Sequence, residues 1–173
     1  MLTRRSLIGL GVAGALAPVG GTAYAAAIRP LPIGLFVAGG DAPAVSDEWL
    51  AAEVAEANRL FAPQQLSIVE AWRRPLPGVG AAIETAADRD ALAKHLVDGA
   101  INVFVVASLR DIDDPKRMRM GVRWRLRKNL QKSYVVLSAA AYSTTLCHEL
   151  GHELGLPHSH VVDNVMSYKR ERP

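Results

Sequence analysis

The sequence predicts a single mixed α/β (α+β) domain, and three observations support this. The chain has 173 residues, half of them hydrophobic, so it is long and apolar enough to bury a core. Segments with the alternation or apolar run of a strand are interspersed with segments that have the 3.6-residue period of a helix. No internal repeat or linker separates these segments. We therefore expect residues 26–173 to form one domain.

The first 25 residues have the composition of an export signal. Arg4 and Arg5 give a basic start, a glycine-rich apolar run follows at 7–19, and an A-x-A cleavage site stands at 23–25. The apolar run is too short, and too interrupted by Pro18, to span a membrane stably. The paired arginines resemble a twin-arginine signal, with an ordinary secretory signal as the alternative. We expect the mature chain to be periplasmic or extracellular, with two positive charges fewer than the +3 of the whole chain.

The first half of the mature chain predicts two strands and two helices. An apolar run at 32–38 indicates a buried first strand. Ser46 stands where a helix N-cap is expected, and Pro63 should end that helix. Residues 66–72 alternate between apolar and polar side chains and predict the second strand. After a loop rich in proline and glycine, residues 88–97 have the spacing of a short helix.

The second half begins with the apolar run at 101–107, which predicts the most buried strand. The acidic stretch at 111–114 then indicates a turn, with a calcium site as the alternative. A last short strand is expected at 134–137. Ser143 or Thr144 should cap the helix that follows.

Residues 117–127 alternate between apolar and basic side chains, which predicts a strand with one apolar and one basic face. The basic face consists of Arg117, Arg119, Arg123, Arg125 and Arg127. A row of charges protects an exposed sheet edge from pairing with another chain. The alternative is a surface that attracts acidic substrates or an anionic cell surface. Aromatic residues are few and no nucleic-acid-binding motif occurs, so we expect no nucleic-acid partner.

Residues 148–158, which read HELGHELGLPH, contain the candidate site. His148 and His152 are four apart, so on a helix they share one face and can share one metal ion. Gly155 tolerates positive φ and can end the helix, which places His158 within reach as a third ligand. Three neutral imidazoles leave a fourth position open, which is typical of a catalytic zinc site.

Glu149 lies between the first two ligands, where a general base for a zinc-bound water is needed. A purely structural zinc site normally has four protein ligands and does not need this acid. The residues therefore predict a hydrolase, with a zinc-stabilised binding module that has lost catalysis as the alternative. Cys147 is the only cysteine, so no disulfide forms within the chain, and we expect it to be a small buried apolar residue.

The complete spacing H-E-x-x-H-x-x-G-x-x-H resembles the signature of the metzincin zinc metalloproteases. Met166, in the run NVMSY, matches the methionine of the Met-turn, the turn that lies beneath the metal in that clan. Tyr168 resembles a tyrosine of the astacin and serralysin Met-turn, which can ligate zinc or stabilise the transition state. Ser159, directly after the third histidine, is more similar to matrixins.

This resemblance implies a metzincin-like (zincin) catalytic domain, with a five-stranded mixed twisted sheet and two main helices. It implies that residues 117–127 form the antiparallel strand that lines the substrate cleft. It also implies a zinc-dependent endopeptidase that binds Zn²⁺ and acts on a peptide or protein substrate. Eighteen residues follow Gly155, so we expect the lower subdomain of that clan to be minimal.

Overall fold

The computed structural model describes residues 27–77, 81–126, 128–169 and 171. Its main sheet contains β1 (Arg29–Val37), β2 (Leu66–Pro75), β4 (Ile101–Val106), β6 (Gly121–Leu126) and β7 (Asn129–Ser138). A two-stranded sheet pairs β3 (Ala82–Ile83) with β5 (Ser108–Leu109). The helices are α1 (Asp47–Phe61), α2 (Ala86–Ala91) and α3 (Thr145–Glu153), with the 3₁₀ helices η1 (Ala62–Gln64) and η2 (Leu92–His95).

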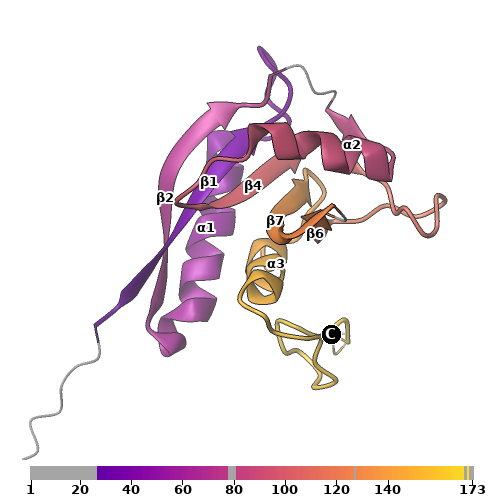
Figure 1. The fold of residues 1–173 in the computed structure, drawn as a ribbon. Coiled ribbons are helices and arrows are strands. Elements are labelled where there is room, and N and C mark those ends of the chain that lie inside the picture. The colour runs from indigo at the N-terminus through magenta and orange to yellow at the C-terminus, as the bar shows by residue number, and fades with distance from the viewer. Residues whose placement is uncertain (1–26, 78–80, 127, 170, 172–173) are drawn as a thin grey trace, which may run out of the picture.

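The main sheet is mixed and twisted, as predicted, with the strand order β2-β1-β4-β7-β6 (Figure 1). β1 runs parallel to β2 and β4, and β4 runs parallel to β7. β6 alone is antiparallel, pairs with β7 and forms one edge of the sheet. The expected fold class is therefore confirmed.

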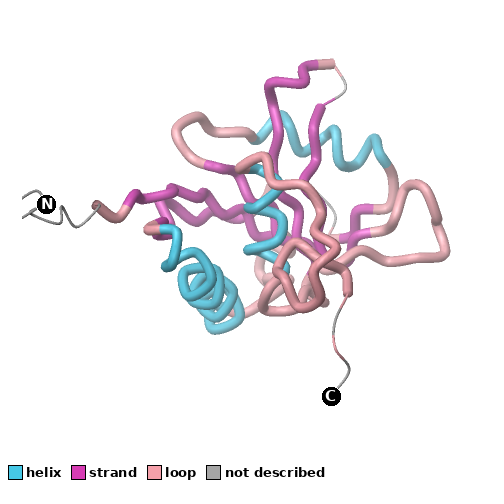
Figure 2. Tube along the Cα trace, turned by 90° about the horizontal axis from the view of Figure 1, so that it is seen from below, coloured by secondary structure: helices cyan, strands magenta, loops and turns pink. Residues whose placement is uncertain are grey.

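Helices cover both faces of this sheet (Figure 1, Figure 2). Val103 and Val105 of β4 pack with α1 and α3, whereas Phe104 and Val106 pack on the opposite face, with Leu92 of η2. These four side chains of β4 are fully buried. Burial on both faces explains why this strand is a continuous apolar run in the sequence.

The beginning of α3 differs from the prediction. Thr144 is the N-cap residue, but its side chain makes no capping hydrogen bond, because its backbone is helical (φ −92°, ψ −6°) where a capping residue is extended. The backbone N–H of Leu146 instead donates to the carboxylate of Glu53 on α1. Glu53 is buried, and no sequence pattern indicated its role. A carboxylate at a helix N-terminus satisfies a free N–H and interacts favourably with the helix dipole.

The predicted strand at 117–127 is wrong in extent, because β6 begins only at Gly121. The backbone N–H of Arg119 donates to Leu109 O over 2.7 Å, so the preceding segment follows β5 rather than β7. Within β6 the alternation is confirmed. Its apolar side chains pack against the core on the face of the sheet that α2 covers. These side chains are Val122, Trp124 and Leu126. Arg127 lies outside the described residues.

The predicted export signal, residues 1–25, also lies outside the described residues. In the part of the chain that the structure does describe, no helix combines the length and the apolar character that crossing a bilayer requires.

Candidate metal centre

The C-terminal end of α3 brings the third histidine back to the first two. Gly155 has φ +90°, and its N–H donates to His152 O over 3.0 Å. The N–H of Leu156 donates to Gly151 O over 2.9 Å. These two bonds form a Schellman turn, the helix ending that favours glycine. The reversal places His158 beside His152, as the sequence predicted.

The three histidines form a cluster that could hold a metal ion, with one ligand atom from each within 4.8 Å of the others. Nε2 of His152 lies 3.1 Å from Nε2 of His148 and 3.0 Å from Nε2 of His158. His148 is buried on α3, whereas His158 is exposed on the loop. The site is therefore open on one side.

Backbone carbonyls fix the orientation of two of these rings. Nδ1 of His148 lies 2.7 Å from Val165 O, and Nδ1 of His152 lies 2.8 Å from Leu156 O. A carbonyl only accepts, so each Nδ1 donates, and the lone pair of the neutral ring is then on Nε2. Two such lone pairs about 3 Å apart repel each other, and a cation between them removes this repulsion. The donor set thus fits a metal ion.

Glu149 is 6% exposed and lies on α3 between the two helical ligands. Burial raises the pKa of its carboxyl to about 7, against the opposing effects of a hydrogen bond from the backbone N–H of Arg123 and of the charge on Arg119. A carboxylate with a pKa near neutrality can both accept and release a proton at physiological pH. Glu149, the predicted general base, is thus a buried carboxylate on the helix that carries His148 and His152.

Gly121, the first residue of β6, allows this close approach of the edge strand to α3. A Cβ at this position would lie 2.7 Å from Thr145 Cγ2 and 3.0 Å from Glu149 Cγ. Any larger residue would displace the strand or the carboxylate. Gly121 was not among the predicted site residues, although a glycine inside an alternating strand pattern often marks close packing.

Met166 lies in a tight turn packed against α3. Its side chain is buried, and a Cβ on Gly151 would come within 2.5 Å of the Met166 sulfur. The N–H of Met166 donates to Asn164 Oδ1 over 2.9 Å, and its carbonyl accepts from the N–H of Ser159 over 2.9 Å. The second bond connects this turn to the residue after His158, so the turn supports the loop that carries the third histidine.

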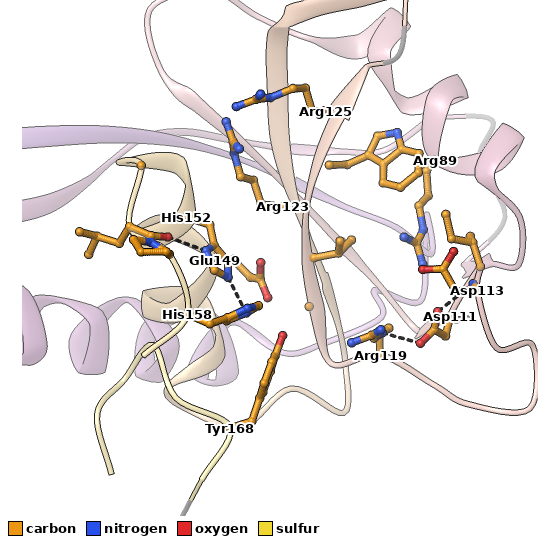
Figure 3. Close-up of a pocket in the computed structure, with 17 residues that line it drawn as sticks. Arg89, Asp111, Asp113, Arg119, Arg123, Arg125, Glu149, His152, His158 and Tyr168 are labelled. Atoms are coloured by element: carbon orange, nitrogen blue, oxygen red, sulfur yellow. Dashed lines mark hydrogen bonds and ion pairs between the residues drawn. The ribbon is translucent and has the colours of Figure 1, made fainter. Parts of the chain in front are cut away.

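Tyr168 follows this turn and faces the histidine cluster. Its ring centroid lies 4.5 Å from that of His158 and 5.5 Å from that of His148. Burial and the charge on Glu149 raise the pKa of its hydroxyl, so this group stays protonated at neutral pH and can donate a hydrogen bond. In Figure 3 its hydroxyl end points into the space between His158 and Arg119.

Two cavities open onto the cluster. One, of about 530 Å³, is lined by His152, His158 and residues of β6, and the other, of about 350 Å³, by His148 and the segment before β6. Four residues line both cavities, namely Arg119, Gly121, Glu149 and Tyr168. A chain passing from one cavity to the other would cross the proposed base and the tyrosine.

The arginines near these cavities do not form one uniform face. Nε of Arg123 lies 2.7 Å from a carboxylate oxygen of Glu153, whose other oxygen accepts from the Ser133 hydroxyl over 2.5 Å. Nε of Arg119 lies 2.7 Å from Asp111 Oδ2. Arg125 is exposed and lines the larger cavity. The charge of the predicted basic face is therefore partly neutralised, because Asp111 and Glu153 pair with two of its arginines.

Asp111 and Cys147 have structural roles in this arrangement. Besides Arg119, Asp111 accepts from the N–H groups of Asp113 and Asp114, over 2.9 and 3.4 Å, which accounts for the turn and for this carboxylate without a calcium ion. Cys147 is buried, as expected, and burial raises the pKa of its thiol to about 12. A thiol with so high a pKa is unreactive at neutral pH.

No protein-family model matches the sequence, and no curated protein matches it. Solved structures do resemble the fold. Metalloproteinase-II from Bacteroides fragilis superposes with a TM-score of 0.52 at 13% identity, over 83% of this chain and 47% of that chain. A chain of a chaperone–substrate complex gives a TM-score of 0.48 at 14% identity, over 80% of this chain and 28% of that chain. This chain thus spans about half the length of the metalloproteinase, and shares its fold.

Proposed function

We propose that this chain is a zinc-dependent endopeptidase of the metzincin type. The observation that carries the proposal is the convergence of three histidine Nε2 atoms beside the buried carboxylate of Glu149. Two nitrogen ligands, each about 2.0–2.1 Å from a tetrahedral zinc ion, are about 3.3 Å apart. The distances of 3.0 and 3.1 Å between the Nε2 atoms are close to this value.

In the proposed mechanism the chain holds zinc through His148, His152 and His158. Bound zinc supplies a Lewis acid that polarises the scissile carbonyl and activates water. Glu149 accepts a proton from the attacking water and returns it to the leaving amine. The Tyr168 hydroxyl donates to the carbonyl oxygen as negative charge develops on it.

The proposed substrate is an extended segment of a peptide or protein. β6 is an antiparallel edge strand, and its residues line the larger cavity, so its outer edge can pair with such a segment. Arg125, exposed on this wall, favours substrates with an acidic side chain. The basic start and the cleavage pattern of residues 1–25 support export to the periplasm or beyond.

A matched pair of histidine variants tests the metal site. His158→Ala should reduce the zinc content of purified protein well below one ion per chain, because a ligand is lost. His160→Ala, two residues along the same loop, should leave the zinc content unchanged. Elemental analysis after dialysis against a defined zinc buffer measures both. If His158→Ala binds as much zinc as the wild type, the site is refuted.

The peptidase activity needs its own test. Incubating the zinc-loaded mature chain with a diverse peptide pool should yield discrete cut sites, and a chelator should abolish them. The other candidate function is a zinc-stabilised binding module. That module becomes the better account if the protein binds zinc stoichiometrically and cleaves no peptide.

A further inference from the structure

The larger cavity extends from the histidine cluster to both faces of the edge strand β6. In Figure 3 Arg125 lies on one side of this strand, whereas Arg89 of α2 and Asp113 lie on the other. Trp124 lines the second side, because its side chain packs on the face of the sheet that α2 covers. An extended segment paired with β6 points alternate side chains to the two faces, so every second one enters the part of the cavity beside Arg89.

Arg89 is a buried cation that three contacts hold in place. The residue is 3% exposed, and its guanidinium carbon lies 5.0 Å from the centre of the Trp124 ring. Its Nη2 donates to the carbonyl of Arg110, and its own carbonyl accepts from the Tyr134 hydroxyl. Trp124 is held in turn, because its Nε1 donates to Asp90 Oδ1 over 2.7 Å. The guanidinium therefore has a fixed orientation against the wall of the cavity.

No carboxylate of the described residues forms an ion pair with this guanidinium. Asp111, which lines the same cavity, is already paired with Arg119. Nε of Arg89 is buried without a hydrogen-bond partner. Nη1 has no partner in the described part of the chain either and is not among the fully buried atoms, so it is the atom that the cavity reaches. Buried arginines are almost always paired, because a charge removed from water is costly, so Arg89 is suited to bind an anion that enters this cavity.

We propose that Arg89 is a specificity-determining residue that binds a carboxylate of the substrate on the α2 face of β6. The inference rests on the proposed function, since a peptide in the cleft is what brings a carboxylate there. Burial lowers the pKa of Arg89, and the charges of Asp111 and Asp113 counteract this. The exposed Asp113 also repels an incoming carboxylate, so it limits the preference that Arg89 creates. Arg125 differs from Arg89, because an exposed charge acts through water and is screened by salt, whereas a buried one is screened much less.

Matched peptides test the inference by their rates of cleavage. Each pair is amidated at the C-terminus and differs by glutamate or glutamine at one position, which is moved along the peptide. At one position the glutamate peptide should have a kcat/KM about 10- to 100-fold higher, the usual range for a hydrogen bond to a charged group. A glutamine peptide with a free C-terminus shows whether the chain end supplies the carboxylate instead of a side chain. The absence of an advantage for either carboxylate would overturn the inference.

Three variants separate specificity from structure. Arg89→Gln should remove most of the advantage and leave cleavage of the glutamine peptide nearly unchanged, whereas an equal fall for both peptides would mean a structural role and overturn the inference. Asp113→Asn, at an exposed position, should raise the advantage about two- to threefold, and an unchanged ratio would show that the carboxylate does not enter beside Arg89. Arg74→Gln is the matched control, because Arg74 lies 4.8 Å from the centre of the Trp72 ring but lines neither cavity. The advantage should also persist at physiological salt, and its loss there would assign it to Arg125 instead.

A binding experiment needs neither cleavage nor a substitution at Arg89. Zinc-loaded Glu149→Gln protein, labelled with ¹⁵N, is titrated with the glutamate and glutamine peptides while the Arg89 Nε–H and Trp124 Nε1–H signals are followed by NMR. Both N–H groups should shift with the glutamate peptide, which should bind about tenfold more tightly than the glutamine peptide. Equal affinities, or no shift of the Arg89 signal, would overturn the inference. If the wild type cleaves no peptide, the proposed function fails, and this titration still decides whether Arg89 binds a carboxylate.

Discussion

Replacing Glu149 by Gln keeps the shape of the side chain and removes its ability to accept a proton. We expect kcat/KM to fall by about 10²–10⁴-fold, the usual contribution of a general base. Zinc content should stay the same, because the three histidines and not Glu149 are the proposed ligands. Peptide cleavage and metal analysis on the same samples measure both. Activity within tenfold of the wild type would remove Glu149 from the mechanism.

Glu153→Gln is the control for that experiment. Glu153 is on the same helix, but its carboxylate is bound to Arg123 and Ser133 and does not line either cavity. The glutamine oxygen can accept from Arg123 while its NH2 group donates to the Ser133 hydroxyl, so the activity should change far less than in Glu149→Gln. A comparable loss in both variants would indicate that the helix had shifted.

Among single residues, the sequence predicted those whose relative positions are set by their spacing along one helix. His148, His152 and Gly155 follow from helix geometry, and the structure brings His158 to them. The contacts of Glu53 with the Leu146 N–H and of Asp111 with Arg119 could not be predicted, because only the tertiary fold brings these groups together.

Among the secondary-structure elements, the edge strand β6 likewise has features that the sequence predicted and one that it did not. Its alternation of apolar and basic side chains predicted a strand, and the apolar half of that pattern is buried as expected. Its start at Gly121 could not be predicted, because the residues before it pair with a different neighbour. Which strand a segment pairs with is a non-local choice, so hydrophobic period alone cannot give the boundary.

Arg123 and Arg125 occupy equivalent positions on β6 and should differ in their effect on stability. The side chains of Arg123 and Glu153 are 22% and 14% exposed, so Arg123→Gln leaves a half-buried carboxylate without its cation. We expect the free energy of unfolding to fall by about 1–3 kcal/mol. Arg125→Gln, at an exposed position, should stay within about 0.5 kcal/mol of the wild type. Urea denaturation measures both, and equal losses would contradict the separate roles.

Arg125 should instead affect the choice of substrate. Two opposite charges 8 Å apart in water attract each other by about 0.5 kcal/mol, so an acidic peptide should gain about two- to threefold in kcat/KM at low salt. Screening removes most of this gain at physiological ionic strength, where the Debye length is about 8 Å. Arg125→Gln should lose the advantage over a matched neutral peptide. If the variant keeps the same salt dependence, the arginine protects the sheet edge and does not select substrates.

For the whole molecule, the two main helices meet at a buried carboxylate. Glu53 of α1 is 3% exposed, accepts from the Leu146 N–H at the start of α3, and burial raises its pKa to about 7 from an ordinary value of 4.5. Between pH 4.5 and 7 the folded chain therefore keeps a proton that the unfolded chain loses. The contribution of Glu53 to stability is fully present below pH 4.5 and is lost as pH rises through 7.

Glu53→Gln should consequently make the free energy of unfolding less dependent on pH. A shift from 4.5 to about 7 corresponds to a loss of up to about 3 kcal/mol in the wild type above neutral pH. Glutamine carries no charge and can still accept from Leu146, so the variant should exceed the wild type by up to that amount at pH 8 and match it at pH 4. Chemical denaturation across this range, at a fixed zinc concentration, measures the difference. Asp41→Asn, at an exposed position before the same helix, should follow the wild-type curve. Parallel curves for wild type and Glu53→Gln would show that Glu53 is charged in the fold at every pH tested, and that its carboxylate is solvated rather than buried between the two helices.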